Sequence, residues 1–432
     1  MVGAVGVAAA ERLAMTGGRP VRDTRTRPWP AWPVGTDDDV AAVASVIKSG
    51  KWTRWTGDRV QTLEAALQTY TGARRAVAVA SGTAALEVAL KAAGIRPGDE
   101  VIVPAFTFVA TATAVLQAGG IPVFADVLPE THNLDPLSAE SLVTDRTRAI
   151  VPVHIAGLPC DMERILAVAQ RHGLRVIEDA AQAIGGVWQG RRVGTIGDAG
   201  CYSFQASKNL PSGEGGAVVT DDPVLGDRAF SLMHIGRIAG GDFYTHYVLG
   251  WNYRLTELQA ALLLSQFERY PALQQRRQHN AAFLRDALLS IPGIEPARQD
   301  PFVTEHGLHG YACRYLAGQF APGRRLPRAT FLKALRAEGI PCSVGYDRPL
   351  YKNPLFLDAR EAMRDDCPFA CGHAAALAVD YSRVCLPNVE RLCADETLWF
   401  PQPVLLGARR DMQDIVEAML KIQAHAAALS DE

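Results

Sequence analysis

One lysine, Lys208, stands in a stretch whose residue types suit carbonyl chemistry. It lies in the segment GCYSFQASKNLPSGEGG, residues 200–216, after a strand-like run and before a glycine-rich bend. Such a bend leaves room for a flat ligand, and a lysine beside a cavity loses its proton more readily because desolvation disfavours the charged amine. A neutral lysine amine can attack a carbonyl carbon and form a Schiff base. The alternative is an ordinary solvated lysine beside a turn.

A second group of residues is suited to binding an anion. Ser81, Gly82 and Thr83 follow a short strand predicted over residues 75–80 and precede an apolar-periodic run over 84–90. Free backbone N–H groups at a helix start, with the helix dipole and two hydroxyls, favour a phosphate. The alternative is a plain helix cap.

The third feature is a carboxylate at a strand end. A buried strand predicted over 174–177 delivers Glu178 and Asp179 at its carboxyl end, where ligands of open α/β sheets collect. Asp179 could pair with a protonated ring nitrogen, although a helix cap or a structural ion pair would use the same residue type. Together, the anion-binding helix start at 81–83, the Asp179 carboxylate and the Lys208 amine match the phosphate, the ring nitrogen and the aldehyde of pyridoxal phosphate.

The elements that must position these groups alternate between strand and helix. Short apolar strands are predicted over 75–80, 101–103, 122–125, 149–153, 174–177 and 217–220, with helical lengths between most of them. This pattern predicts an α/β fold with a mainly parallel sheet covered by helices on both faces. Helical stretches are expected over 256–267 and 271–289. After residue 291 the sequence is frequently interrupted by Pro, Gly and His. We therefore expect an N-terminal arm (1–35), a large domain (36–275) and a small C-terminal α/β domain (276–432).

Composition excludes several classes of partner. The chain has 432 residues, 48% of them hydrophobic, and a formal net charge of −2, which gives no electrostatic case for nucleic acid or an anionic membrane. The purely apolar runs are too short to span a bilayer, so no membrane embedding is expected. Eight scattered cysteines lack paired zinc-type spacing. They favour reduced thiols in a cytoplasmic protein, with no metal site.

With these motifs in this order, the chain resembles the DegT/DnrJ/StrS aminotransferases, which are fold-type I pyridoxal phosphate enzymes acting on sugars and cyclitols. The resemblance runs from about Gly17 to the last helix. Its motifs are SGTAAL (81–86), GDEV (98–101), VIEDAAQA (176–183), SFQASK (203–208) and GEGG (213–216).

The resemblance implies a role for each matching residue near the cofactor. Lys208 would form the Schiff base, and Asp179 would keep the pyridine nitrogen protonated. The phosphate would be bound by Gly82, Thr83 and Ser203. The alternative for Ser203 is a strand hydroxyl bonded to the backbone.

Three further residues are matched to the family's contacts. Phe108 would stack on the cofactor ring opposite Ala181. Gln182, where many members carry histidine, would lie near the ring hydroxyl, and an amide can donate there. Asn252 would reach the phosphate of a neighbouring subunit, which implies a homodimer with shared active sites. The alternatives are a core phenylalanine, a helix-surface amide and a turn residue.

Within the family, SFQASK and the tail WFPQPVLLG (399–407) are most similar to the glutamine-dependent scyllo-inosose aminotransferases of aminoglycoside pathways. This branch implies amino transfer from glutamine, or glutamate, to a keto-cyclitol. The alternatives are a nucleotide-keto-sugar aminotransferase, a 3-amino-5-hydroxybenzoate synthase and a non-catalytic regulator that binds pyridoxal phosphate. The presence of Lys208 argues against the regulator.

Overall fold

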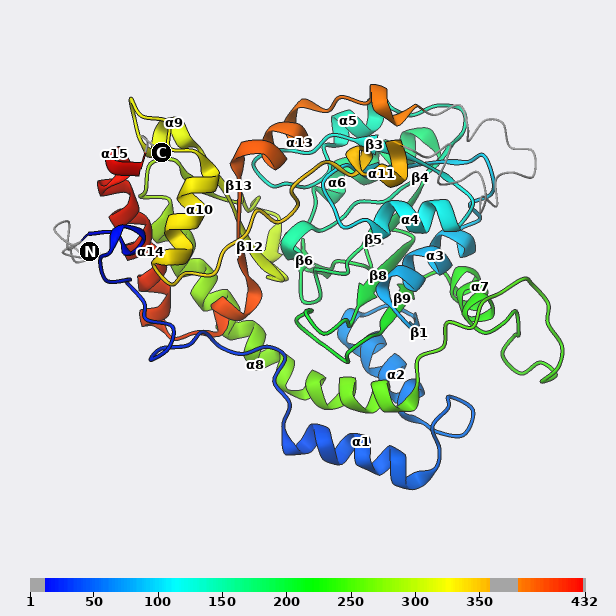
Figure 1. The fold of residues 1–432 in the computed structure, drawn as a ribbon. Coiled ribbons are helices and arrows are strands. Elements are labelled where there is room, and N and C mark those ends of the chain that lie inside the picture. The colour runs from blue at the N-terminus through cyan, green and yellow to red at the C-terminus, as the bar shows by residue number, and fades with distance from the viewer. Residues whose placement is uncertain (1–11, 358–379, 430–432) are drawn as a thin grey trace.

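A seven-stranded sheet forms the larger part of the molecule (Figure 1). The computed structural model describes residues 12–357 and 380–429. The strand order is β1-β9-β8-β5-β4-β2-β3, and every strand runs in the same direction except β9, which is antiparallel to both its neighbours. The predicted α/β class with a mainly parallel sheet is therefore confirmed. The strands are β1 (Arg75–Val79), β2 (Glu100–Pro104), β3 (Ile121–Ala125), β4 (Thr147–Ile150), β5 (Arg175–Asp179), β8 (Ala199–Ser203) and β9 (Gly216–Thr220).

Apolar side chains cover both faces of this sheet. In β1, Val77 and Val79 join one buried cluster, whereas Ala76 and Ala78 join another, because successive side chains of a strand point to opposite faces. The first cluster includes residues of α3 (Gly82–Ala92), α4 (Ala110–Gln117) and α7 (Pro223–Met233), and the second includes residues of α2 (Arg59–Thr71), α5 (Pro136–Ser141) and α6 (Met162–His172).

A single long helix, α8 (Glu257–Leu288), connects the two parts of the molecule (Figure 1). The sequence predicted helical stretches over 256–267 and 271–289, the second as a connecting helix; their helical character is confirmed, and only their separation into two helices is wrong. Pro271 lies inside one continuous helix, since the lost N–H bond is local while the packing on either side continues. Just before the proline, the hydroxyl of Tyr270 donates to the carbonyl oxygen of Ile184 at 2.7 Å.

The second part of the molecule is a smaller unit built on a three-stranded antiparallel sheet. Its strands are β10 (Ile294–Pro296), β12 (Gly310–Tyr315) and β13 (Thr397–Pro401). Its helices are α9 (Ala317–Phe320), α10 (Arg328–Ala337), α14 (Arg409–Ala424) and α15 (Ala426–Leu429). These elements share a separate apolar cluster. The predicted boundary at residue 275 lies inside α8, so the division into 36–275 and 276–432 stays a prediction.

The described part of the N-terminal arm, residues 12–35, runs along the smaller unit before α1 (Asp37–Ser49) begins. Buried Arg22 holds it there by contacts of 2.6 and 2.9 Å with the carboxylates of Asp411 and Asp414 on α14. Farther along, the indole of Trp32 reaches the loop of Lys208. The arm therefore connects the smaller unit to the candidate site.

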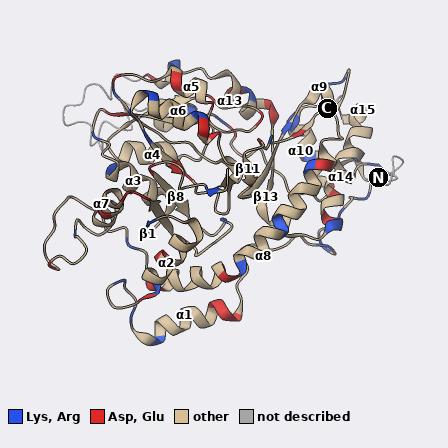
Figure 2. Ribbon diagram, turned by 180° about the vertical axis from the view of Figure 1, so that it is seen from behind, with Lys and Arg blue, Asp and Glu red and all other residues tan. Residues whose placement is uncertain are grey.

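The remaining elements are short. A second three-stranded sheet comprises β11 (Val303–Glu305), β6 (Val187–Trp188) and β7 (Arg191–Arg192), and two further short helices are α11 (Pro354–Leu357) and α13 (Pro387–Arg391). Figure 2 shows basic and acidic residues interspersed over both parts of the molecule. Among the helices within 12–357 and 380–429, none is long and apolar enough to cross a membrane.

Candidate active site

The three groups predicted from sequence lie at the carboxyl ends of β1, β5 and β8. β5 and β8 are parallel neighbours, with Asp179 opposite Cys201, and Lys208 follows β8. β1 runs in the same direction as β8, with β9 between them, and it leads directly into Ser81. Parallel strands present their carboxyl ends at one edge of the sheet, so the fold gathers segments that are about a hundred residues apart.

The start of α3 provides unsatisfied backbone donors. The hydroxyl oxygen of Ser81 accepts a hydrogen bond from the N–H of Ala84 at 3.1 Å and caps the helix. The N–H groups of Gly82 and Thr83 donate to no other group in the described chain. A Cβ atom at Gly82 would lie 2.7 Å from the Cβ of Ser203, so only glycine lets this backbone approach the Ser203 side chain. The structure thus places Gly82, Thr83 and Ser203 around one set of free donors.

Asp179 is a buried carboxylate without a cationic partner at ion-pair distance in the described chain. Oδ1 accepts a hydrogen bond from the N–H of Ala181 at 3.1 Å, and Oδ2 accepts one from the hydroxyl of Thr111 at 2.8 Å. Burial raises the pKa of Asp179 and outweighs the effect of these hydrogen bonds. A positively charged ligand atom would relieve this cost.

Thr111 was missed by the sequence reasoning as a site residue. It lies on α4, and its hydroxyl is 3.0 Å from the hydroxyl of Thr107 one turn earlier. The i, i+4 spacing of two threonines in the segment 104–111 was the available signal. What the spacing does not reveal is that this hydroxyl meets Asp179.

The backbone of Asp179 is fixed by the neighbouring strand end. Its N–H donates to the carbonyl of Pro152 at 2.9 Å, and its carbonyl accepts from the N–H of His154 at 3.2 Å. Beside it, the buried carboxylate of Glu178 lies 3.0 Å from Nε2 of His154 and accepts the N–H groups of Gly194 and Ile196 at 2.7 and 2.6 Å. Glu178 has no function assigned from the sequence, and in the structure its carboxylate joins His154 to the backbone of residues 194–196.

Lys208 lies in a tight loop after β8. Its backbone N–H donates to the carbonyl of Gln205 at 2.8 Å, and its carbonyl accepts the indole N–H of Trp32 at 3.1 Å. Burial lowers the pKa of the Lys208 amine from about 10.5 to about 8, against the opposing effect of the Asp179 charge. A larger fraction of neutral amine is therefore present near neutral pH than for a solvated lysine.

Both the oxygen and the nitrogen of the Gln182 side-chain amide form hydrogen bonds. Oε1 accepts the N–H of Ala156 at 2.8 Å, and Nε2 donates to the hydroxyl of Tyr346 at 3.0 Å. Gln182 is 7% exposed, which excludes the alternative of a helix-surface amide. Tyr346 lies between α10 and α11, packs against the apolar cluster of the large sheet and was not predicted. Its ring packs edge-on against Phe106 and Trp399, at centroid distances of 5.1 and 5.7 Å.

The last two predicted residues lie on the surface of this chain. Phe108 is 59% exposed, which excludes the alternative of a core residue and leaves its ring free to contact a ligand. Asn252 is exposed, its backbone forms a bridge with His234, and its side chain makes no hydrogen bond within the described chain. The structure does not bring Asn252 into contact with the other predicted residues.

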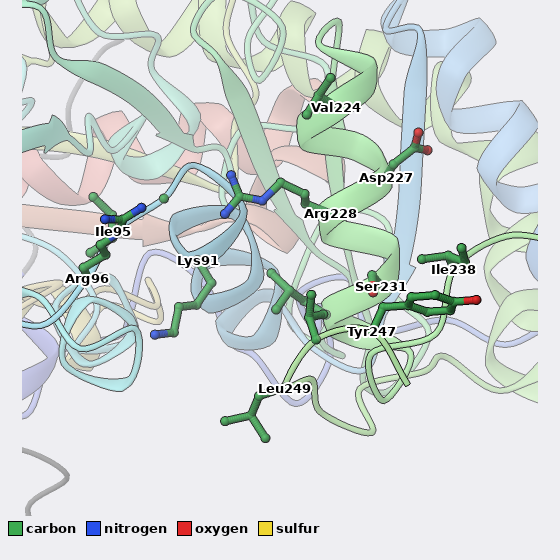
Figure 3. A pocket seen from close by; sticks show the side chains of 13 residues that line it. Lys91, Ile95, Arg96, Val224, Asp227, Arg228, Ser231, Ile238, Tyr247 and Leu249 are labelled. Carbon is green, nitrogen blue, oxygen red and sulfur yellow. The ribbon is translucent and has the colours of Figure 1, made fainter. Parts of the chain in front are cut away.

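Two cavities lie in different parts of the described chain. The first, of about 540 Å³, adjoins the Lys208 loop and is lined by Trp32, Pro33, Gln205, Ala206, Ser207, His309, Gly310, Ser343, Trp399, Phe400, Pro401, Gln402 and Pro403. The second, of about 490 Å³, is lined by Lys91 of α3, residues of the loop that follows α3, residues of α7 and residues of the segment 238–249, and Figure 3 shows Lys91, Arg96 and Arg228 on its walls. None of the predicted site residues lines either cavity. Within the described residues, no cluster of His, Cys, Asp and Glu could hold a metal ion.

Comparison with known proteins identifies the relatives of this chain. The model of the DegT/DnrJ/EryC1/StrS aminotransferase family matches residues 33–397. An L-glutamine:2-deoxy-scyllo-inosose aminotransferase from Streptomyces kanamyceticus is 38% identical, over 98% of this chain and 99% of that protein. One of the same name from Streptomyces fradiae is also 38% identical, over 97% and 99%. The crystal structure of 3-amino-5-hydroxybenzoic acid synthase is similar with a TM-score of 0.79 and 31% identity, over 93% of this chain and 98% of that one.

Proposed function

Because this chain belongs to the DegT/DnrJ/EryC1/StrS aminotransferase family, we propose that it uses pyridoxal phosphate to transfer the amino group of glutamine to a keto-cyclitol. In the overall reaction, the α-amino group of glutamine and the ketone oxygen of the acceptor change places. Glutamine leaves as its 2-keto acid amide, and the acceptor leaves as an amine.

The residues at the sheet edge fit pyridoxal phosphate. The free N–H groups of Gly82 and Thr83, with the hydroxyl of Ser203, suit a phosphate. The buried, unpaired carboxylate of Asp179 suits a protonated pyridine nitrogen, and the Lys208 amine suits the aldehyde. Gln182 would lie at the ring hydroxyl with the second N–H of its amide, and Phe108 would cover a face of the ring.

When bound, pyridoxal phosphate supplies an electron sink for the pair left behind when a substrate's α-proton departs. The side chains of this chain move the protons and stabilise the ring charge. Nζ of Lys208 takes the proton from the α-carbon of glutamine and, in the second half of the cycle, returns a proton to the acceptor carbon. Asp179 supplies the negative charge that keeps the ring nitrogen protonated, and Thr111 orients that carboxylate.

One observation carries this proposal: the amine, the carboxylate and the free N–H groups lie at one sheet edge of a chain whose full-length relatives are named for glutamine and 2-deoxy-scyllo-inosose. The test incubates the purified protein with pyridoxal phosphate, glutamine and 2-deoxy-scyllo-inosose, and detects the amine and the keto acid amide by mass spectrometry. Efficient turnover of a nucleotide-linked keto-sugar, with none of the cyclitol, would contradict the proposal. No change in cofactor absorbance on adding glutamine would favour the regulator.

We further propose that the working unit is a homodimer in which Asn252 serves the neighbouring site. The loop between α7 and α8 projects from the molecule (Figure 1) and leaves Tyr244 and Leu249 86% and 92% exposed. Large apolar side chains at this exposure favour a partner surface, and a second copy is the commonest partner.

The electrostatics near Asn252 support an anionic ligand that this chain does not itself supply. The ring of His234, the backbone partner of Asn252, packs at a tilt of 31° against Trp55, with a centroid distance of 4.3 Å. The guanidinium groups of Arg237 and Arg254 lie 5.5 and 5.0 Å from the Trp55 ring, and neither forms an ion pair in the described chain. The phosphate of a neighbouring subunit's cofactor would provide the missing negative charge.

A further inference from the structure

A third cavity, of about 300 Å³, lies between the connecting helix α8 and strand β12 of the smaller unit, and is here called the α8–β12 cavity. None of the described residues that line it is Asp or Glu, and Arg285 is the only Lys or Arg among them. Arg285 is exposed and lies 3.3 Å from the carboxylate of exposed Asp286. An ion pair in water holds its partners weakly, so the guanidinium of Arg285 remains open to another anion.

The hydroxyl of Tyr311 is an unsatisfied donor in this cavity. Tyr311 lines the cavity and is 7% exposed, and its hydroxyl has no hydrogen-bond partner in the described chain. Buried Tyr315 on the same strand shows the usual arrangement, because its hydroxyl donates to the carbonyl of Leu326 at 2.9 Å. Buried polar groups of folded proteins are nearly always hydrogen-bonded. The exception at Tyr311 indicates a partner that is not part of the chain.

The ring of His306 supplies a second donor. Burial lowers the pKa of His306 to about 3, so the ring is neutral near pH 7. Nδ1 accepts the backbone N–H of Leu308 at 2.9 Å. A neutral imidazole carries one proton, which is therefore on Nε2, and this N–H has no partner in the described chain. Arg285, Tyr311 and His306 thus bring three open donors to one cavity.

The charge and the walls of the cavity define the class of ligand. One cation without an acidic neighbour in the lining matches a single negative charge, which favours a carboxylate over a phosphate dianion. Much of the remaining lining is apolar and mostly small: Ala281, Ala282, Ala297, Leu308 and Ala312. Such walls leave width for a compact apolar body beside the carboxylate.

Two lining residues, His306 and Leu308, belong to a segment that also holds the Lys208 loop. Asn209, which directly follows Lys208, donates from Nδ2 to the carbonyls of Gly307 and Leu308 at 2.8 and 3.0 Å. Leu308 has a φ of 56°, in the left-handed region that favours glycine, so the surrounding packing must hold this segment in place. A ligand that contacts His306 and Leu308 therefore restricts a segment to which the Lys208 loop is bonded.

We propose that the α8–β12 cavity binds a small molecule that carries one carboxylate on a compact apolar body, and that the bound molecule stabilises the Lys208 loop. The carboxylate oxygens accept from Arg285, Tyr311 and His306. The site is separate from the proposed reaction centre, because neither Lys208 nor Asp179 lines the cavity. Binding there requires neither pyridoxal phosphate nor turnover.

The experiment compares two probes of the same shape by isothermal titration calorimetry of the purified protein near neutral pH. The probes are cyclohexanecarboxylate and its neutral analogue cyclohexanecarboxamide. The carboxylate should bind at least about tenfold more tightly, because hydrogen bonds to a charged oxygen are the stronger ones. Hydrogen exchange measured by mass spectrometry should also slow in the peptide that contains Lys208 when the carboxylate is added.

The Tyr311→Phe variant keeps the ring and removes the unsatisfied hydroxyl. Affinity for the carboxylate should fall at least about tenfold. The Tm of the protein without probe should stay unchanged or rise, since the lost hydroxyl has no partner in the described chain. The matched control is Tyr315→Phe, which loses the bond to Leu326 and should show the reverse, a lower Tm with probe affinity within about twofold of wild type.

The Arg285→Gln variant removes the cation at an exposed position, so it should fold normally. Affinity for the carboxylate should fall about fivefold, the size of one favourable surface ion pair, and affinity for the carboxamide should not change. Arg276→Gln removes a cation from an exposed position of the same helix that does not line the cavity. This control should bind both probes as the wild type does.

Three results would overturn the site: no binding of the carboxylate at about 10 mM, which would leave water as the occupant of the cavity, equal affinities for the two probes, or an unchanged carboxylate affinity in both Tyr311→Phe and Arg285→Gln. Binding with unchanged hydrogen exchange in the Lys208 peptide would overturn the effect on that loop. Because neither readout uses activity, failure of the proposed function would leave both of them intact.

Discussion

The hydroxyl of Thr111 donates a hydrogen bond of 2.8 Å to Oδ2 of Asp179, although the two residues are 68 positions apart. This contact joins α4 to the end of β5 inside a buried environment. A hydrogen bond to a buried charged group contributes about 1.5 to 3 kcal/mol, so Thr111 has a measurable effect on how Asp179 functions.

Thr111→Val keeps the shape of the side chain and removes this donor. We expect kcat to fall about 10- to 100-fold, because the carboxylate loses a hydrogen bond that favours its charged form. Cofactor retention should change little, since the phosphate contacts are intact. Steady-state kinetics and dialysis test both statements. The matched control is Thr113→Val on the same helix, whose hydroxyl contacts only the carbonyl of Ala110 at 3.4 Å and whose kcat should stay within twofold of wild type.

The lowered pKa of Lys208 predicts how the cofactor-free protein captures pyridoxal phosphate. Only the neutral amine attacks the aldehyde. With a pKa of about 8 in place of 10.5, the capture rate should be half-maximal near pH 8 and level off above about pH 9. Stopped-flow absorbance between pH 6 and pH 10 follows this rate. A rate that is still rising steeply at pH 10 would show that the amine is solvated.

Lys208→Ala should fold, bind the cofactor more weakly and form no borohydride-reducible link between cofactor and chain. The physical reason is that no other amine stands at the aldehyde position. Mass spectrometry after borohydride treatment detects the link, and circular dichroism checks the fold. A variant that keeps full turnover and a covalent cofactor at another lysine would refute the assignment of Lys208.

The Asp179→Asn variant distinguishes a catalytic role of the Asp179 carboxylate from a structural one. We expect kcat to fall about 100-fold or more, because a neutral amide cannot keep the ring nitrogen protonated. Burial raises the pKa of Asp179, so its charged form disfavours the folded state above that pKa. Removing the charge should therefore leave the Tm of the cofactor-free protein at pH 7 unchanged or higher. An unchanged kcat with a lower Tm would make Asp179 a structural cap.

Shared active sites predict complementation between two defective chains. If Asn252 serves the neighbouring site, a hybrid dimer of Lys208→Ala and Asn252→Ala chains contains one site with both defects and one with neither. Activity should then rise above that of the two parent proteins when the chains are dissociated together and reassociated. The Asn252→Ala defect must first be measured, since one phosphate contact contributes modestly. A severe defect with no recovery after proven subunit exchange would contradict the shared-site proposal.

The sequence by itself determined which groups could do chemistry and at which kind of position they stand. The alternation of short apolar strands with helical lengths predicts a parallel sheet, and a parallel sheet brings its strand ends to one edge. Asp179 is the last residue of β5, and Ser81 and Lys208 come shortly after β1 and β8, which is a local property of the chain. Their gathering could therefore be predicted without knowing any side-chain contact.

Only the tertiary structure decided which distant side chains complete the site. Trp32 bonds the carbonyl of Lys208 across 176 residues, and Tyr346 bonds Gln182 across 164. Neither partner is marked by periodicity or by a motif, because such contacts depend on how the segment after α10 and the N-terminal arm pack against the large sheet. The continuity of α8 through Pro271 has the same origin, since packing along the whole helix overrides a local preference for a break. Local patterns fix strands, turns and caps, whereas the pairing of remote surfaces is set by the packing of the whole chain.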